Sequence, residues 1–293
     1  MTSESRDSRP LAGILFTVAA MVTLAGADAL AKHLTALYAV AQILWVRYVL
    51  YAAYGVFAAY GESGRCGFRS RNVTLQLARG TLLVVANIVI VYSFSVLALA
   101  DVHAVIAVAP LAVTAASVWL LGERVDWQRW AAVAVGFVGI LIIVRPGLGV
   151  FEPVALLPLA GAGLYTTYQI LTKLVTRNDG PGTTQFYTGL TGLFWFSLML
   201  PFTWTAPAPL DWAWLMAAAV AGTAAHVMIV RGLHLAPAST LQPFNYSMLV
   251  AAAVFGFWFF DEVPDTPTIM GACTVVGAGL YVMYRERRAV RSG

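Results

Sequence analysis

The chain has 293 residues, of which 60% are hydrophobic and only 11% are charged, and its mean hydropathy is +0.76. A soluble globular domain usually carries about 25% charged residues, so a water-soluble enzyme is excluded because these few charges would not cover its surface. The net charge of +4 comes from lysines and arginines scattered through short loops, a pattern that sets membrane topology rather than one that binds nucleic acid.

Ten apolar runs follow one another along the chain. An α-helix needs about 20 apolar residues to cross the core of a bilayer, and each run is close to that length. The runs cover residues 11–32, 37–60, 73–95, 98–121, 128–145, 153–173, 184–204, 211–233, 238–260 and 266–284. The sequence therefore predicts an all-α polytopic membrane protein with ten transmembrane helices.

The basic residues are distributed unevenly between the two sides of these predicted helices. Fifteen of the 18 lysines and arginines, Arg79 among them, fall on the side that holds the N-terminus. Lys32 and Arg145 fall on the other side, and Arg47 lies inside a span. The positive-inside rule places both termini in the cytoplasm, and we expect the protein in the inner membrane of a bacterial-type cell.

Two acidic turns indicate an internal repeat. Glu123 and Glu262 lie 139 residues apart, and each turn joins the last two spans of a five-span half. Because five is odd, the second half enters from the opposite side, which predicts an inverted repeat with a solute site between the halves. The predicted parts are a cytoplasmic tail at 1–10, a first five-helix repeat at 11–147, a second, inverted repeat at 148–284, and a basic cytoplasmic tail at 285–293.

Several segments follow a recognisable pattern, beginning with Gly-Glu-Arg-Val at 122–125. The segments are 26–32, 42–47, 122–125, 145–147, 235–239 and 261–264. Together they resemble the EamA-type transporters of the drug/metabolite transporter superfamily. The resemblance implies a ten-helix, proton-coupled or facilitative exporter whose cavity is walled mainly by helices 1, 3, 4, 6, 8 and 9. It also implies a possible place in the branch that exports aromatic and other amino acids.

Arg47 lies about ten residues into the second span, which puts it about 15 Å deep at 1.5 Å per residue. A charge at that depth costs at least about 2.5–3.5 kcal/mol, so it should face the bundle interior or water. Arg47 and Tyr51 share one helical face. Arg47 is therefore either a ligand for a solute carboxylate or a structural arginine capped by carbonyls or by Asp28.

Asp28 is the one acidic residue well inside a predicted span. Its expected depth is about one helical turn from that of Arg47. It is either a group that carries a proton or binds a solute ammonium, or the partner of Lys32 in an i, i+4 pair near the membrane surface.

Further polar and aromatic side chains inside the spans are expected to face inward, because unpaired amides are costly in hydrocarbon. Each one either lines a cavity or joins two helices, and Pro110 is either a hinge or part of close helix packing. His226 is either a core histidine or a proton carrier. The candidates are Asn87, His103, Pro110, Tyr165, Tyr168, Gln169, His226, Gln242, Asn245 and Tyr246.

The sequence contains no Walker-type phosphate loop, nucleophile elbow or metal-spaced cluster, so we expect no cofactor, metal or ATPase activity. We predict a monomeric, non-enzymatic secondary-active or facilitative transporter that exports small metabolites, chiefly amino acids including aromatic ones, by alternating access. The first alternative is an exporter of drugs or lipophilic cations with Asp28 as the coupling carboxylate. The remote alternative is an intramembrane lipid-modifying enzyme.

Overall fold

The computed structural model describes residues 10–109, 111–113, 115–116, 127–144, 154, 156–175, 178–235 and 241–291, and within these ranges the chain is helical without strands. Two 3₁₀ helices, η1 (Gly64–Phe68) and η3 (Gln242–Tyr246), precede α3 and α11. The α-helices are α1 (Pro10–Thr35), α2 (Val40–Ser63), α3 (Val73–Val96), α4 (Leu99–Ile106), α6 (Trp127–Val144), α7 (Leu156–Val175), α8 (Pro181–Thr203), α9 (Pro209–Leu235), α11 (Ser247–Phe260) and α12 (Thr266–Arg291). Each predicted span contains one of them, so the all-α fold class is confirmed.

Four of the described helices are long and apolar enough to cross a membrane, namely α1, α2 with η1, α3 and α9. α7 and α8 are not among them because both carry polar residues on their inner faces. α8 buries four threonines, of which Thr188 and Thr191 donate hydrogen bonds to carbonyls four residues earlier. The crossing of the membrane by all ten helices stays a prediction.

The main contacts between the two halves are symmetric when the first half (α1 to α6) is exchanged with the second half (α7 to α12). α2, α4 and α6 pack against their counterparts α8, α11 and α12. The contact of α1 with α9 is mirrored by that of α7 with α3, and the contact of α1 with α11 by that of α7 with α4. The fold is thus built from two related five-helix units.

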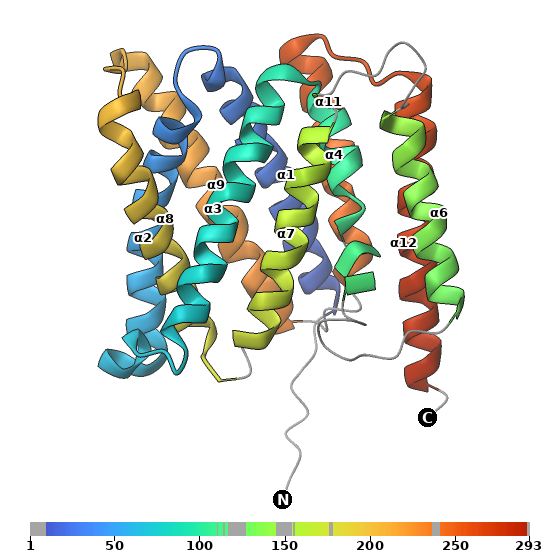
Figure 1. Cartoon of the computed structure of the whole chain (residues 1–293), viewed down its shortest axis with the longest axis horizontal. Helices are drawn as coiled ribbons and strands as arrows, with labels where there is room; N and C mark the ends of the chain where they lie inside the picture. The colour runs from blue at the N-terminus through green and yellow to red at the C-terminus, as the bar shows by residue number, and fades with distance from the viewer. Residues whose placement is uncertain are drawn as a thin grey trace, which may run out of the picture.

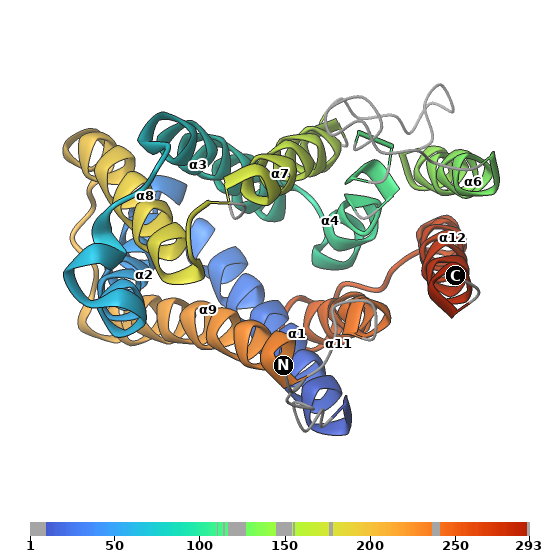
Figure 2. The same ribbon diagram turned by 90° about the horizontal axis from the view of Figure 1, so that it is seen from below.

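The start of α1 and the end of α12 lie on one face of the bundle (Figure 1), which we call the terminal face; the other is the opposite face. Seen from the terminal face, α3, α7 and α4 lie along one side, and α9, α1 and α11 lie along the other (Figure 2). α2 and α8 close one end of this arrangement, and α6 and α12 close the other. The centre of the molecule is therefore bordered by helices of both halves.

The fourth helix of each half is discontinuous, unlike the single runs expected at 98–121 and 238–260. α4 ends at Ile106 and is followed by a turn at Ala107 and Val108. Pro110 itself lies outside the described residues, but a proline lacks the N–H that would bond the carbonyl four residues earlier, at Ile106. In the second half, η3 precedes α11, so each break adjoins a proline in the sequence.

α2 and α8 approach each other closely through glycines. A Cβ added to Gly189 would lie 2.7 Å from the Cα of Ala52, and one added to Gly55 would lie 2.9 Å from the backbone oxygen of Gln185. Small residues allow such backbone contact between helices in a membrane. This contact fixes the position of α2, which carries Arg47.

Candidate functional site: a charged central cavity

A cavity of about 170 Å³ lies among α1, α2, α3, α4, α7, α9 and α11. Both halves contribute to its wall, which is apolar apart from a few charged, amide and phenol groups. Seven of the residues singled out from the sequence line it: Asp28, Arg47, Tyr51, Asn87, His103, Tyr165 and His226. The structure thus brings together side chains that are up to 198 positions apart in the chain, from Asp28 to His226.

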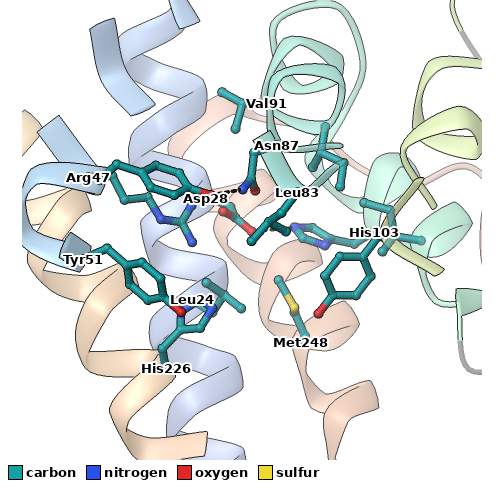
Figure 3. A pocket seen from close by; sticks show the side chains of 14 residues that line it. Leu24, Asp28, Arg47, Tyr51, Leu83, Asn87, Val91, His103, His226 and Met248 are labelled. Atoms are coloured by element: carbon teal, nitrogen blue, oxygen red, sulfur yellow. Dashed lines mark hydrogen bonds and ion pairs between the residues drawn. The ribbon is translucent and has the colours of Figure 1, made fainter. Parts of the chain in front are cut away.

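Arg47 extends from α2 toward the centre of the cavity (Figure 3). Among the described residues, no carboxylate, carbonyl or hydroxyl accepts a hydrogen bond from its guanidinium. On the α9 side it borders Gly222, where an added Cβ would lie 3.0 Å from Nε of Arg47. Within the described part of the chain, no hydrogen bond or close ion pair therefore caps this charge, although the charges of Arg47 and Asp28 are near enough to interact.

Asp28 on α1 lies between Arg47 and His103 in Figure 3. Its Oδ2 is 3.5 Å from Nε2 of His103 on α4, and both side chains are buried. This separation is longer than a normal hydrogen bond. The expected alternative, a pair between Asp28 and Lys32, is wrong because Lys32 forms its ion pair with Glu262.

Tyrosines and amides form the wall next to Arg47. Asn87 Nδ2 donates to the hydroxyl of Tyr48 at 2.8 Å, and Tyr51 donates to Gln185 Oε1. The ring of Tyr51 meets that of His226 edge to face, with centroids 5.4 Å apart. Sequence reasoning missed Tyr48 because the i, i+4 spacing from Arg47 selects Tyr51, whereas the residue after Arg47 points about 100° away on an ideal helix.

The other singled-out residues lie elsewhere or outside the description. Tyr168 stacks on Tyr165, and its hydroxyl accepts a hydrogen bond from Arg79. Gln169 is half-buried and does not line the cavity. Asn245 is half-buried in η3, and Tyr246 lines an apolar crevice beside α12. Pro110 and the side chain of Gln242 lie outside the described residues.

Arg79 is the functional candidate that sequence reasoning missed. It was counted with the loop charges of the terminal face, but its side chain is 0% exposed within the bundle. It donates to the hydroxyls of Tyr168 at 3.1 Å, Thr172 at 3.3 Å and Thr188 at 2.6 Å, and to the Thr184 carbonyl at 2.9 Å. Its position inside the apolar run 73–95 was the feature of the sequence that could have indicated a buried arginine.

A polar chain links Arg79 to the terminal face. Gln76 accepts from Arg79 at 3.0 Å and donates to Asp179 Oδ2 at 2.8 Å. Asp179 also accepts hydrogen bonds from Ser70 and from the backbone N–H of Arg71. This network joins α3 to the connection between α7 and α8.

At the opposite face, Lys32 and Glu262 tie three elements together. Besides its ion pair with Glu262, Lys32 donates to the Leu97 carbonyl at 2.7 Å. Glu262 also accepts from the backbone N–H of Leu99 at 2.9 Å. The ends of α1 and α11 are thereby held to the connection between α3 and α4.

Comparison with known proteins gives the class. The model of the EamA-like transporter family matches residues 11–145 and again residues 153–285. The chain belongs to this family and is a membrane transporter of the drug/metabolite transporter type. One solved crystal structure has the same fold, with a TM-score of 0.66 at 16% identity over 94% of this chain and 98% of that chain.

Individual relatives have diverse names. The S-adenosylmethionine uptake transporter of Rickettsia prowazekii is 23% identical over 78% of each chain. The riboflavin transporter of Vibrio cholerae is 30% identical over 64% of this chain and 63% of the relative. The pseudopaline exporter CntI of Pseudomonas aeruginosa is 26% identical over 91% and 94%. These names include uptake and export, and none of the three names mentions free amino acids.

Proposed function

We propose that this chain transports small solutes that carry an α-amino acid group, by alternating access of the central cavity to the two faces. The observation that carries the proposal is the guanidinium of Arg47, which donates no hydrogen bond to any of the described residues and faces the same cavity as the carboxylate of Asp28. An α-amino acid group presents a carboxylate and an ammonium on one carbon atom, so it matches two opposite charges that face one small space.

The two charges differ in how they would hold the solute. The guanidinium of Arg47 stays charged and can bind a carboxylate through two parallel hydrogen bonds. The carboxylate of Asp28 would accept hydrogen bonds from the ammonium. The imidazole of His103 lies beside this carboxylate, with Nε2 3.5 Å from Oδ2. The rings of Tyr48, Tyr51 and Tyr165 offer apolar surface for the solute side chain.

The proposal is consistent both with the amino acid substrates predicted from the sequence and with the substrate named for some of the relatives. Free amino acids, aromatic ones included, carry this group, and so does S-adenosylmethionine, which the Rickettsia relatives are named for. The volume of about 170 Å³ is below the ~300–1,000 Å³ of common ligand sites. It suits a small amino acid, whereas a larger solute needs the two halves to move apart.

The predicted orientation in the membrane rests on charge. Arg65, Arg69 and Arg71 are exposed around η1 at the terminal face, which supports a cytoplasmic terminal face in a cell inner membrane. Removing Arg79 from the count leaves fourteen basic residues on that side against two. We further propose that the protein works as a monomer and moves amino acids out of the cell.

The alternatives are weaker. A lipophilic cation could bind the carboxylate of Asp28, but the positive charge of Arg47 in the same cavity would repel it. An intramembrane lipid-modifying enzyme has no support in the names of the relatives above, which are all transporters.

Counterflow in proteoliposomes tests the proposal. Purified protein should exchange L-phenylalanine or S-adenosylmethionine without ATP, and each solute should be preferred over its decarboxylated counterpart. Arg47→Leu should lower the exchange rate at subsaturating solute by about tenfold or more, because a charge-assisted hydrogen bond contributes about 1.5–3 kcal/mol, and Arg47→Lys should restore part of it.

The matched control is Arg69→Leu, which removes an exposed arginine outside the bundle and should leave exchange unchanged. Equal transport of each solute and its decarboxylated counterpart by the wild-type protein would overturn the carboxylate assignment. Riboflavin serves as a solute without an α-amino acid group, and its preference over both would also overturn the proposal.

A further inference from the structure

Arg79 is a second guanidinium inside the bundle, and within the described ranges no carboxylate is hydrogen-bonded to it. Its partners are three hydroxyls, one amide oxygen and one backbone carbonyl, and its buried Nε has no hydrogen-bond partner among the described residues. A buried charge held only by neutral groups is costly. Because charge-assisted bonds between two ions are stronger than bonds to neutral groups, a carboxylate that reached Arg79 would displace these partners.

The position of Arg79 is related to that of Arg47 by the internal repeat. Arg47 on α2 borders Gly222 on α9, and Arg79 on α3 binds Thr188 on α8. When the two halves are exchanged, the contact of α2 with α9 corresponds to the contact of α8 with α3. The two arginines therefore lie at counterpart helix contacts.

The two arginines differ in their environment in this conformation. Arg47 lines the cavity, whereas Arg79 is sealed among α3, α7 and α8. In transporters built from inverted repeats, alternating access moves one repeat or bundle against the other around the site between them. Such a movement, acting on counterpart contacts, would open the contact at Arg79 and close the one at Arg47.

An aromatic path joins the cavity to Arg79. Tyr165 lines the cavity and stacks on Tyr168 with ring centroids 5.8 Å apart, and the guanidinium of Arg79 lies 5.2 Å from the Tyr168 centroid. α3 begins at the terminal face (Figure 1), and Arg79 precedes the cavity residue Asn87 by eight positions, about 12 Å at 1.5 Å per residue. Arg79 is therefore on the terminal side of the cavity.

We propose that Arg79 is a second carboxylate-binding position of the transport path, which the solute occupies when the cavity is open to the terminal face. This inference rests on the proposed function, because it takes the carboxylate of an α-amino acid as its ligand. The hydroxyls of Tyr168, Thr172 and Thr188 hold the guanidinium until the solute replaces them.

The test measures KM for exchange from each face separately, in proteoliposomes with uniformly oriented protein. The solutes are L-phenylalanine and S-adenosylmethionine, with their decarboxylated counterparts as competitors. Arg79→Gln should raise the KM of the amino acid at the terminal face by about tenfold or more and change the opposite-face KM by less than about twofold. Arg79→Lys should recover part of the loss, and the control Arg69→Gln should change neither KM.

Thr188→Val separates a transport role from a structural one. It keeps the size of the side chain but removes one hydroxyl that competes with the solute, so the terminal-face KM should fall below the wild-type value. If Arg79 only holds helices together, this variant lowers thermal stability and leaves KM unchanged, which would overturn the inference. If Arg79→Gln does not fold, the terminal-face KM of Thr188→Val alone tests the inference.

The outcomes distinguish this inference from the proposed function. If the wild-type protein does not discriminate against the decarboxylated solutes at either face, the proposed function fails and this inference fails with it. If discrimination is present and Arg47→Gln abolishes it at the opposite face, but Arg79→Gln and Thr188→Val leave the terminal-face KM unchanged, only the role of Arg79 is overturned.

Discussion

At the scale of single residues, a charge inside an apolar run can be found without a structure, but its partners cannot. Arg47 and Asp28 were predictable as site candidates because each interrupts a long hydrophobic segment, and the structure places both on one cavity. Arg79 was misassigned because it lies only six residues into α3. At that depth, a buried arginine and one that reaches the surface look alike in sequence.

The partners of Arg79 show why sequence reasoning stops there. Tyr168, Thr184 and Thr188 follow it by 89 to 109 positions, so only the folded chain brings them to the guanidinium. The same holds for the contact of Asp28 with His103, which are 75 positions apart.

Gly222→Ala tests the placement of Arg47. The added Cβ would lie 3.0 Å from Nε of Arg47, so the flexible guanidinium must shift while the backbone need not. We expect a several-fold rise in KM for the amino acid, about 1 kcal/mol in binding, with little change in melting temperature. Counterflow and thermal unfolding of the same preparations provide the check, and an unchanged KM would show that the position of the guanidinium does not matter.

At the scale of elements, apolar run length predicted where helices lie, and turn chemistry predicted where they are joined. The boundaries of α1, α2 and α3 agree with the runs to within three residues. The runs did not predict the breaks in the α-helices inside 98–121 and 238–260. A run can be apolar throughout whether or not the helical hydrogen bonds of its backbone are continuous. A proline adjoins each of these places in the sequence, and of the two only Pro110 was predicted as a hinge candidate.

A pair of glycine substitutions tests the close contact between α2 and α8. Gly189→Ala places a Cβ 2.7 Å from the backbone of Ala52, and such overpacking costs about 1–3 kcal/mol. Gly163→Ala in α7 is the matched control, because nothing lies within 4 Å of its added Cβ; helix propensity alone should make it neutral or stabilising by about 0.5–1 kcal/mol. Thermal unfolding in detergent measures both, and equal melting temperatures would contradict the packing argument.

The connection between α7 and α8 predicts a pH effect. Burial raises the pKa of Asp179, but hydrogen bonds from Ser70, the N–H of Arg71 and Gln76 outweigh burial and hold the pKa below its ordinary value. A lowered pKa adds stability that is complete above the unfolded value of about 3.9 and is lost as the pH falls through the lower folded value.

Asp179→Asn should therefore lower the melting temperature at pH 7 and flatten its decline below about pH 4. The control is Asp261→Asn at an exposed position after α11, which should leave the melting temperature at pH 7 unchanged. A decline of the same steepness in the wild-type protein and in Asp179→Asn would contradict the contribution of this carboxylate.

At the scale of the whole molecule, the symmetric contacts explain why the site lies where the halves meet. α1 and α3 each contact a helix of the other half, so the cavity wall is assembled from both repeats and changes whenever they move relative to each other. Composition and the two acidic turns predicted the repeat, and the family match over two ranges agrees with a two-repeat architecture. The solute was beyond the reach of such patterns, since it depends on a few side chains in the cavity.

The polar character of α7 and α8 has a consequence for biogenesis. Neither is among the helices that are apolar enough to cross a membrane by composition, so each would leave the protein-conducting channel for lipid less readily than α1 to α3. Both helices pack on helices that precede them in the chain, α8 on α2 and α7 on α3. We therefore expect the insertion of α7 and α8 to depend on α2 and α3 being in the bilayer already.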